Sequence, residues 1–201
     1  TAIIQQVTDI FRSLESRYTL SAHISQEHSA AAEMREFLAD FATTSSNITV
    51  ETHDAEGNTL YFDILKDGAP TGITFRGIPN GHEFTSLLLA LLNADGKGKN
   101  LPDEGIAHRV KALQGDIHLQ TYISLSCTNC PDVVQTLNIF ALLNPNIRHE
   151  MVDGALFQDE VNAKGVQAVP SVFADGELLH VGRGSLGELL EKLEAKYPSS
   201  G

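Results

Sequence analysis

Residues 122–131 read Tyr-Ile-Ser-Leu-Ser-Cys-Thr-Asn-Cys-Pro, and this stretch decides the fold. A predicted strand, Ile117–Ser124, ends in it, and a Cys-x-x-Cys motif with a proline directly behind it follows. Because proline is tolerated in a helix only near the first turn, Pro131 predicts a helix that starts at the motif, with Cys127 opening it. The unpaired N–H groups and the dipole of a helix start favour an anion, so we expect the pKa of the Cys127 thiol to be lowered there.

The motif contains both cysteines of the chain, Cys127 and Cys130. Cys127 is predicted to be the nucleophile, while Cys130 lies one turn deeper on the same helix face and can close a disulfide onto it. Two thiols so placed can pass two electrons to a partner disulfide through a mixed disulfide. We therefore expect Cys127 to attack the partner and Cys130 to resolve the mixed disulfide.

Two other uses of the cysteine pair compete with the redox interpretation. A structural zinc ion needs about four ligands, but the chain has no second Cys-x-x-Cys motif, and His118, His149 and His180 are scattered singly. The pair could also be two inert buried cysteines. The spacing ahead of a proline favours redox chemistry, and we expect no bound metal.

The composition excludes several classes of protein. Two cysteines cannot form the disulfide framework of a small secreted domain. The 26 acidic residues outnumber the 14 basic ones, and the net charge of −12 repels nucleic-acid phosphates. The longest strongly apolar run, residues 87–92, is far shorter than the roughly 18 residues of a membrane span. We expect a cytoplasmic protein that binds neither nucleic acid nor membranes.

The two halves of the chain resemble each other. A shift of 99 positions places His23-Ile24-Ser25 on Tyr122-Ile123-Ser124 without a gap, and Ile48 falls on Ile147. A repeat of this length fits a duplicated small domain, although two unrelated strand–helix–strand halves would also look alike. Where the second copy has Cys127-Thr128-Asn129-Cys130, the first has His28-Ser29-Ala30-Ala31. One copy carries the chemistry and the other is predicted to be a scaffold.

Hydrophobic periodicity predicts an α/β fold with the same element order in both halves. In the first half we expect an amphipathic helix with Ile3, Ile4, Val7, Ile10, Phe11 and Leu14 on its apolar side, strand Tyr18–Ile24, helix Ala30–Phe41, strand Ile48–Thr52, a hairpin of Leu60–Leu65 and Ile73–Arg76 with its turn at Asp67-Gly68, and the buried helix Phe84–Leu92. In the second half we expect helix Ile106–Leu113, strand Ile117–Ser124, helix Val133–Leu143, strand Ile147–Val152, a helix around Phe157–Lys164, a hairpin turning at Asp175-Gly176, and helix Leu186–Tyr197.

The glycine-rich segment Asn93–Gly105 has the composition of a linker. It predicts two domains, residues 1–100 without cysteines and residues 101–201 with the redox pair. The expected architecture is therefore two α/β units of the same kind, packed side by side.

The second half resembles the thioredoxin family, in which a strand, a Cys-x-x-Cys motif opening a helix, and an x-Pro before a later strand occur in this order. The stretch from Tyr122 to Gln135, together with Gly81-His82-Glu83-Phe84-Thr85-Ser86-Leu87, is similar to the N-terminal domain of the F subunit of bacterial alkyl hydroperoxide reductase. That domain is two fused thioredoxin-like folds, and the second alone keeps its cysteines. The resemblance implies electron transfer from a flavin-containing, NAD(P)H-oxidising part to a peroxiredoxin partner of the kind that forms the C subunit of that reductase.

The resemblance also implies roles for individual residues. It implies a cis peptide bond at Val169–Pro170, with Pro170 facing the cysteines, whereas a plain strand-opening proline is the alternative. It places the carboxylate of Glu83 close to the redox pair, where it could raise a thiol pKa or relay a proton. Glu83 could instead simply complement a helix dipole. The sequence ends at Gly201, as either a fragment or a free-standing relative would, so the resemblance implies FAD and NAD(P)H binding for a flavoprotein portion and not for these residues.

Two other functions remain open from the sequence. A general protein disulfide oxidoreductase would carry the same motif, and a binding module would use the first half to dock a partner while the thiols were incidental. Residues 182–187 match the dinucleotide pattern G-x-G-x-x-G, but that fingerprint needs a full βαβ unit and an acidic residue about 20 positions on. The chain ends too soon for either, so we predict that this segment is the turn into the last helix.

Overall fold

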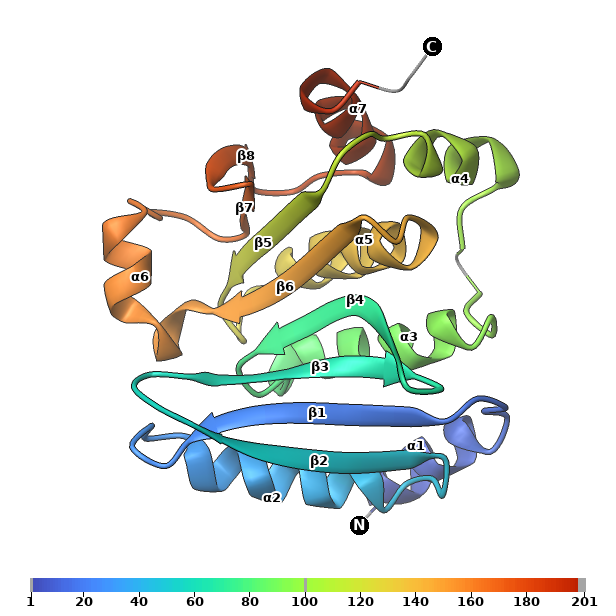
Figure 1. The fold of residues 1–201 in the computed structure, drawn as a ribbon, viewed down its shortest axis with the longest axis vertical. Coiled ribbons are helices and arrows are strands. Elements are labelled where there is room, and N and C mark those ends of the chain that lie inside the picture. Colours follow the sequence, from blue (N-terminus) through green and yellow to red (C-terminus); the bar gives the residue numbers. More distant parts are fainter. Residues whose placement is uncertain (1, 100, 199–201) are drawn as a thin grey trace.

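The computed structural model describes residues 2–99 and 101–198, which we call the first unit and the second unit (Figure 1). The first unit contains α1 (Ala2–Phe11), β1 (Tyr18–Ser25), α2 (Ala31–Ala42), β2 (Ile48–Ala55), β3 (Leu60–Lys66), β4 (Ala69–Arg76), the 3-10 helix η1 (Gly81–Glu83) and α3 (Phe84–Ala94). The second unit contains α4 (Glu104–Lys111), β5 (Ile117–Ile123), α5 (Cys130–Leu143), β6 (Ile147–Asp153), η2 (Gly154–Leu156), α6 (Gln158–Ala163), β7 (Ser171–Ala174), β8 (Glu177–Val181) and α7 (Leu186–Lys196).

The strands form an eight-stranded sheet in the order β2-β1-β3-β4-β6-β5-β7-β8. In each unit the first strand pairs in parallel with the second and antiparallel with the third, so β1 and β5 are equivalent. The repeated order supports the duplication that the sequence predicts. Both hairpins turn at the predicted Asp-Gly pair, between β3 and β4 and between β7 and β8.

The two units are joined edge to edge. Strand β4 of the first unit pairs in parallel with β6 of the second, from Ile73 with His149 to Arg76 with Val152. The sheet therefore runs without a break through both units. They are joined by strand pairing, and not only packed side by side as the sequence predicts. The predicted division at residue 100 stays a prediction, and Asn100 itself lies outside the described residues.

The core lies between the sheet and the helices behind it in Figure 1, α2, α3 and α5. Alternate residues of β1 (Tyr18, Leu20, Ala22 and Ile24) are fully buried, as expected for a strand with one covered face. The rings of Phe62 on β3 and Phe75 on β4 stack with centroids 5.3 Å apart. Helix α3 is mostly buried as predicted, because it packs against α5 of the other unit.

Several predicted boundaries differ from the structure, and two of them concern the redox motif and the connection between the units. Helix α5 starts at Cys130, between the predicted opening at Cys127 and the predicted range Val133–Leu143. Helix α3 continues to Ala94 and α4 starts at Glu104, so the connection between the units is shorter than the predicted linker. Helix α4 starts earlier than the predicted Ile106 because the Asp103 side chain caps it by accepting a hydrogen bond from the Ile106 N–H. No helix in the described ranges is long and apolar enough to cross a membrane.

A substitution at Gly72 on β4 tests how closely the two units pack at their junction. Its φ is +87°, and a Cβ added there would lie 2.7 Å from the Ile147 carbonyl oxygen of the second unit. Gly57 also has a positive φ, +69°, but nothing lies within 4 Å of an added Cβ. We expect Gly72→Ala to lower the free energy of unfolding by at least about 1 kcal/mol more than Gly57→Ala, because it adds a clash to the shared backbone strain. Urea unfolding of both variants measures this, and equal losses would contradict a close-packed junction.

Candidate redox site

Cys127 lies in the turn between β5 and α5, and Cys130 is the first residue of α5. They form a disulfide in this structure, with Cα atoms 5.6 Å apart. Cys130 is fully buried in the core, whereas Cys127 is half-buried. Access from outside therefore favours the Cys127 sulfur, which agrees with the order of attack expected from the sequence.

The position of Cys127 relative to the helix differs from the prediction. The Cys127 N–H donates to the Ser124 carbonyl at 3.0 Å, in a turn that follows β5, and α5 begins three residues later with Pro131 in its first turn. The field of a helix start falls off within one turn, so it acts most directly on Cys130. The preference for Cys127 as nucleophile rests on its exposure and less on the helix dipole.

The chain before β7 faces the cysteines. The Val169–Pro170 peptide bond is cis, which confirms the expectation drawn from the resemblance. The Cys127 sulfur lies 3.9 Å from the Val169 carbonyl oxygen. Pro170 is buried, while the Val169 side chain keeps 36% of its surface exposed. Cys127 and Val169 thus meet at the same accessible spot on the surface.

Glu83 is buried on the helix side of the redox loop. Its Oε1 accepts a hydrogen bond from the Ser86 hydroxyl at 2.7 Å, and that hydroxyl accepts one from the Gln135 amide of α5 at 3.1 Å. The preceding His82 N–H donates to the Leu125 carbonyl, two residues before Cys127, at 3.2 Å. These contacts connect η1 to both sides of the Cys-x-x-Cys motif.

The Glu83 carboxyl group has an unusual protonation equilibrium. Burial raises its pKa to about 7, although the hydrogen bond from Ser86 acts in the opposite direction. Its Oε2 has no hydrogen-bond partner among the described residues. A carboxylate that served only the helix dipole would have a lowered pKa, so these features favour a group that exchanges a proton near neutral pH.

A contact at the motif that the sequence did not indicate comes from Arg183. Its Nε donates to the Asn129 side-chain oxygen at 3.1 Å. The buried His180 holds this loop, because its Nε2 bonds the Arg183 carbonyl at 2.7 Å and its Nδ1 lies 2.7 Å from the Lys192 Nζ. No local spacing in the sequence could have indicated these contacts, since they depend on how β8 and α7 fold back.

Residues 182–187 do not fit a dinucleotide. They join β8 to α7, and β8 pairs antiparallel with β7, whereas the fingerprint lies between parallel strands. No strand follows α7 in the described part of the chain. The segment is the turn into the last helix, as predicted, with the Ser185 hydroxyl accepting the hydrogen bond of the Glu188 N–H.

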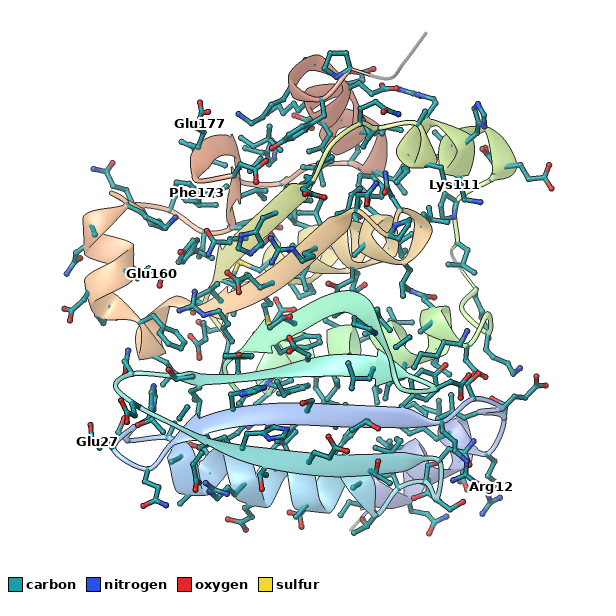
Figure 2. All side chains as sticks on the ribbon, viewed as in Figure 1. Arg12, Glu27, Lys111, Glu160, Phe173 and Glu177 are labelled. Carbon is teal, nitrogen blue, oxygen red and sulfur yellow. A yellow bond between two sulfur atoms is a disulfide. The ribbon has the colours of Figure 1, made fainter. Side chains whose placement is uncertain are left out.

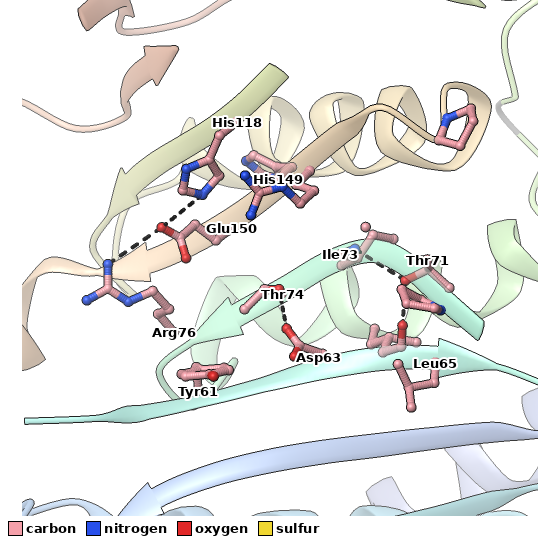
Figure 3. Close-up of a pocket in the computed structure, with 15 residues that line it drawn as sticks. Tyr61, Asp63, Leu65, Thr71, Ile73, Thr74, Arg76, His118, His149 and Glu150 are labelled. Carbon is pink, nitrogen blue, oxygen red and sulfur yellow. Dashed lines mark hydrogen bonds and ion pairs between the residues drawn. The ribbon is translucent and has the colours of Figure 1, made fainter. Parts of the chain in front are cut away.

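Two cavities differ in their relation to the redox pair. Neither is lined by a cysteine, and the larger, about 610 Å³, is lined by β3 and β4 of the first unit and by β5 and β6 of the second (Figure 3). The smaller, about 300 Å³, includes Val169 and lies between the end of β5 and α6. Among the described residues, no three His, Cys, Asp or Glu side chains are grouped so as to hold a metal ion.

Comparison with known proteins agrees with this geometry. A family model described as a thioredoxin domain matches residues 117–195. The F subunit of alkyl hydroperoxide reductase in Pseudomonas aeruginosa is 46% identical over 162 residues, which are 81% of this chain and 31% of that protein. A Bacillus subtilis protein named NADH dehydrogenase is 44% identical over 167 residues, 83% of this chain and 32% of that protein. The chain thus spans about a third of the length of these curated relatives.

A solved structure covers both units. The crystal structure of the N-terminal domain of the alkyl hydroperoxide reductase F subunit of Enterococcus faecalis superposes with a TM-score of 0.86 at 30% sequence identity, and the match covers 96% of this chain and 98% of that one. Both chains thus share the tandem arrangement over nearly their whole length. The chain therefore belongs to the family of N-terminal domains of the alkyl hydroperoxide reductase F subunit, and it is a thiol–disulfide oxidoreductase domain.

Proposed function

We propose that this chain relays electrons, in the cytoplasm, from a flavin-containing module that oxidises NAD(P)H to the disulfide of a peroxiredoxin, the C subunit of the alkyl hydroperoxide reductase system. The observation that carries the proposal is the meeting of the half-exposed Cys127 and the exposed Val169 above the buried Cys130. The name NADH dehydrogenase of the Bacillus subtilis relative supports a nicotinamide as the source of electrons. FAD and NAD(P)H belong to the flavoprotein module, and we assign no residue of this chain to hold them.

The first step joins the chain to its partner. In the reduced form the Cys127 thiolate attacks one sulfur of the peroxiredoxin disulfide, that S–S bond breaks, and the other partner sulfur leaves as a thiolate that takes up a proton. The cysteine that attacks has to be reached from outside, which Cys127 is and Cys130 is not. The Val169 carbonyl lies beside the attacking sulfur, and we propose that the backbone there pairs with the incoming peptide.

The second step releases the partner. Cys130 loses its proton and attacks the Cys127 sulfur, which forms the disulfide seen in this structure and frees the second partner thiol. We propose that Glu83 accepts the proton of Cys130 through the polar groups beneath the motif. Its support is a buried carboxylate, a pKa of about 7, and the Ser86–Gln135 link to α5. Two electrons pass to the peroxiredoxin, and the flavoprotein module then reduces the disulfide again.

The roles of the two cysteines can be separated with single substitutions. Cys127→Ser should abolish disulfide reduction, because the resolving thiol is buried. Cys130→Ser should instead trap a covalent complex between Cys127 and the peroxiredoxin. Non-reducing gel electrophoresis of each variant mixed with oxidised peroxiredoxin shows the complex. A complex formed by the Cys127→Ser variant would reverse the assigned roles.

The pKa of Glu83 predicts a pH-dependent stability. With a folded-state pKa of about 7 and an ordinary value of 4.5, the folded protein binds the extra proton between these values, so its stability falls as the pH rises through that window. We expect Glu83→Gln to gain stability relative to the wild type as the pH rises from about 4.5 to about 7, by at most about 1.4 kcal/mol per pH unit. Urea unfolding at several pH values measures the difference.

The catalytic part of the Glu83 proposal has its own test. Release of the partner from the mixed disulfide should slow by about a hundredfold in Glu83→Gln if the carboxylate serves as general base. Ser86→Ala removes a hydrogen bond that lowers the Glu83 pKa, so it should move the midpoint of the rate against pH upward. Stopped-flow measurement of release checks both. An unchanged rate in Glu83→Gln would leave Glu83 without a role in proton transfer.

A further inference from the structure

One segment of the second unit contacts the first unit at several points. We call residues 153–160, which run from the end of β6 through η2 into α6, the bridging segment. A Cβ added at Gly77 would lie 2.8 Å from the Asp153 Cβ, so the two backbones approach closely. The Asn58 side-chain amide donates to the Leu156 carbonyl at 3.4 Å. The bridging segment is therefore held by residues that follow β2 and β4.

The bridging segment also closes the first unit's counterpart of the redox site. His28 stands where the repeat places Cys127, and it is 6% exposed, with its Nδ1 accepting a hydrogen bond from the Ala30 N–H at 3.0 Å. The ring of Phe157 lies 5.9 Å from the His28 ring and is itself buried. The position that holds the reactive sulfur in one unit is a packing surface in the other.

Arg76 at the end of β4 makes the polar part of this contact. Its two terminal nitrogens donate to the two carboxylate oxygens of Glu160 on α6 at 2.8 and 2.9 Å, and its guanidinium lies 4.4 Å from the centre of the Phe157 ring. The Tyr122 hydroxyl of β5 donates to the same carboxylate. Figure 2 labels Glu160 on α6, and Figure 3 shows Arg76 reaching Glu150, which also contacts His118.

The two-point ion pair between Arg76 and Glu160 is largely shielded from solvent. The Arg76 side chain keeps 18% of its surface and Glu160 keeps 29%, so the pair is screened less than a surface ion pair. A guanidinium bound at two points fixes the direction of its partner as well as its distance. Arg76 of the first unit, together with Tyr122 of the second, thereby fixes both the position and the rotation of α6.

The other side of α6 lines the cavity beside the redox pair. The cavity of about 300 Å³ is lined by Gln158 and Val161 of α6 together with Val166, Ala168 and Val169. Its Val169 wall touches the Cys127 sulfur through the contact of 3.9 Å. A peptide that brings a disulfide to Cys127 has this cavity next to it.

We propose that Arg76 is a positioning residue for the protein partner: through Glu160 it holds α6 so that the cavity beside Val169 receives the residues flanking the disulfide of the peroxiredoxin. The first unit thus takes part in partner selection although it has no cysteine of its own. Val169 both lines this cavity and lies with its carbonyl oxygen 3.9 Å from the Cys127 sulfur, which is the reason to place this partner there. The inference rests on the proposed function, since it names the surface that the same peroxiredoxin uses.

The test compares a protein disulfide with a small one. The full 201-residue chain is reduced, freed of reductant, and mixed either with the oxidised peroxiredoxin or with the small disulfide 5,5′-dithiobis(2-nitrobenzoic acid). In Arg76→Gln the rate with peroxiredoxin should fall by about ten- to a hundredfold, because the cavity wall is displaced, while the small disulfide needs Cys127 alone and should react at the wild-type rate. Arg76→Lys keeps the positive charge but cannot bind the carboxylate at two points. Its rate with the peroxiredoxin should therefore lie between those of the wild type and Arg76→Gln.

Arg109→Gln is the matched control. Arg109 makes a second two-point contact, to Glu194 between α4 and α7, at 3.0 and 2.5 Å, and no part of it touches α6. Hydrogen exchange of the amides of Val161 in α6 and of Lys164 directly after it reports the position of the helix and should quicken in Arg76→Gln but not in Arg109→Gln. A thermal melt of each variant separates displacement of α6 from loss of the fold.

Each outcome decides the inference. Faster exchange in α6 with an unchanged peroxiredoxin rate would overturn it, as would an equal slowing with both disulfides. A wild-type chain that reduces the small disulfide but not the peroxiredoxin would overturn the proposed partner, and the inference with it. A peroxiredoxin-specific loss in Arg76→Gln that Arg109→Gln does not share would establish it.

Discussion

The parallel pairing of β4 with β6 is the interaction on which the rest of the structure depends. Strands β4 and β6 would each be an edge strand of their own unit, and their pairing makes both of them interior strands of one sheet. The register of this pairing sets Arg76 opposite Val152, one residue from Asp153, where the bridging segment begins. Packing of α3 against α5 on the helix side then connects Glu83 to the redox helix. A shift of one residue in this register would turn every side chain of β6 to the opposite face.

The local parts of the fold could be predicted from the sequence because their signals are local. Pro131 fixes where α5 can begin, and the Asp-Gly pairs fix both hairpin turns. The predicted start of α5 is three residues too early because the Cys127 N–H is used in a turn with Ser124, a contact that no residue pattern indicates. A helix boundary of this kind depends on whether the Cys127 N–H bonds in a turn or the helix begins at that residue. The sequence is compatible with both arrangements.

The contacts between the units could not be predicted, since they join residues far apart in the chain. Arg76 and Glu160 are separated by 84 positions, and nothing around either residue differs from an ordinary charged surface. The two interpretations of Glu83 also stayed open for a physical reason. Whether a carboxyl group is charged at neutral pH depends on its burial, and burial is a property of the finished fold. The histidines of the second half illustrate the same limit: His149 is buried between Asn138 and Thr121, a structural position that its spacing does not reveal.

The covering of His28 by Phe157 has an evolutionary consequence. After a duplication, a copy that merely lost its cysteines could regain activity by reverting those positions. Here a thiol restored at position 28 would lie beneath an aromatic ring of the neighbouring unit, out of reach of any client. Recovery would require changes in two units at once, including the release of the ring that now seals the site. The packing between the units therefore prevents the first copy from gaining redox chemistry through a change at position 28 alone.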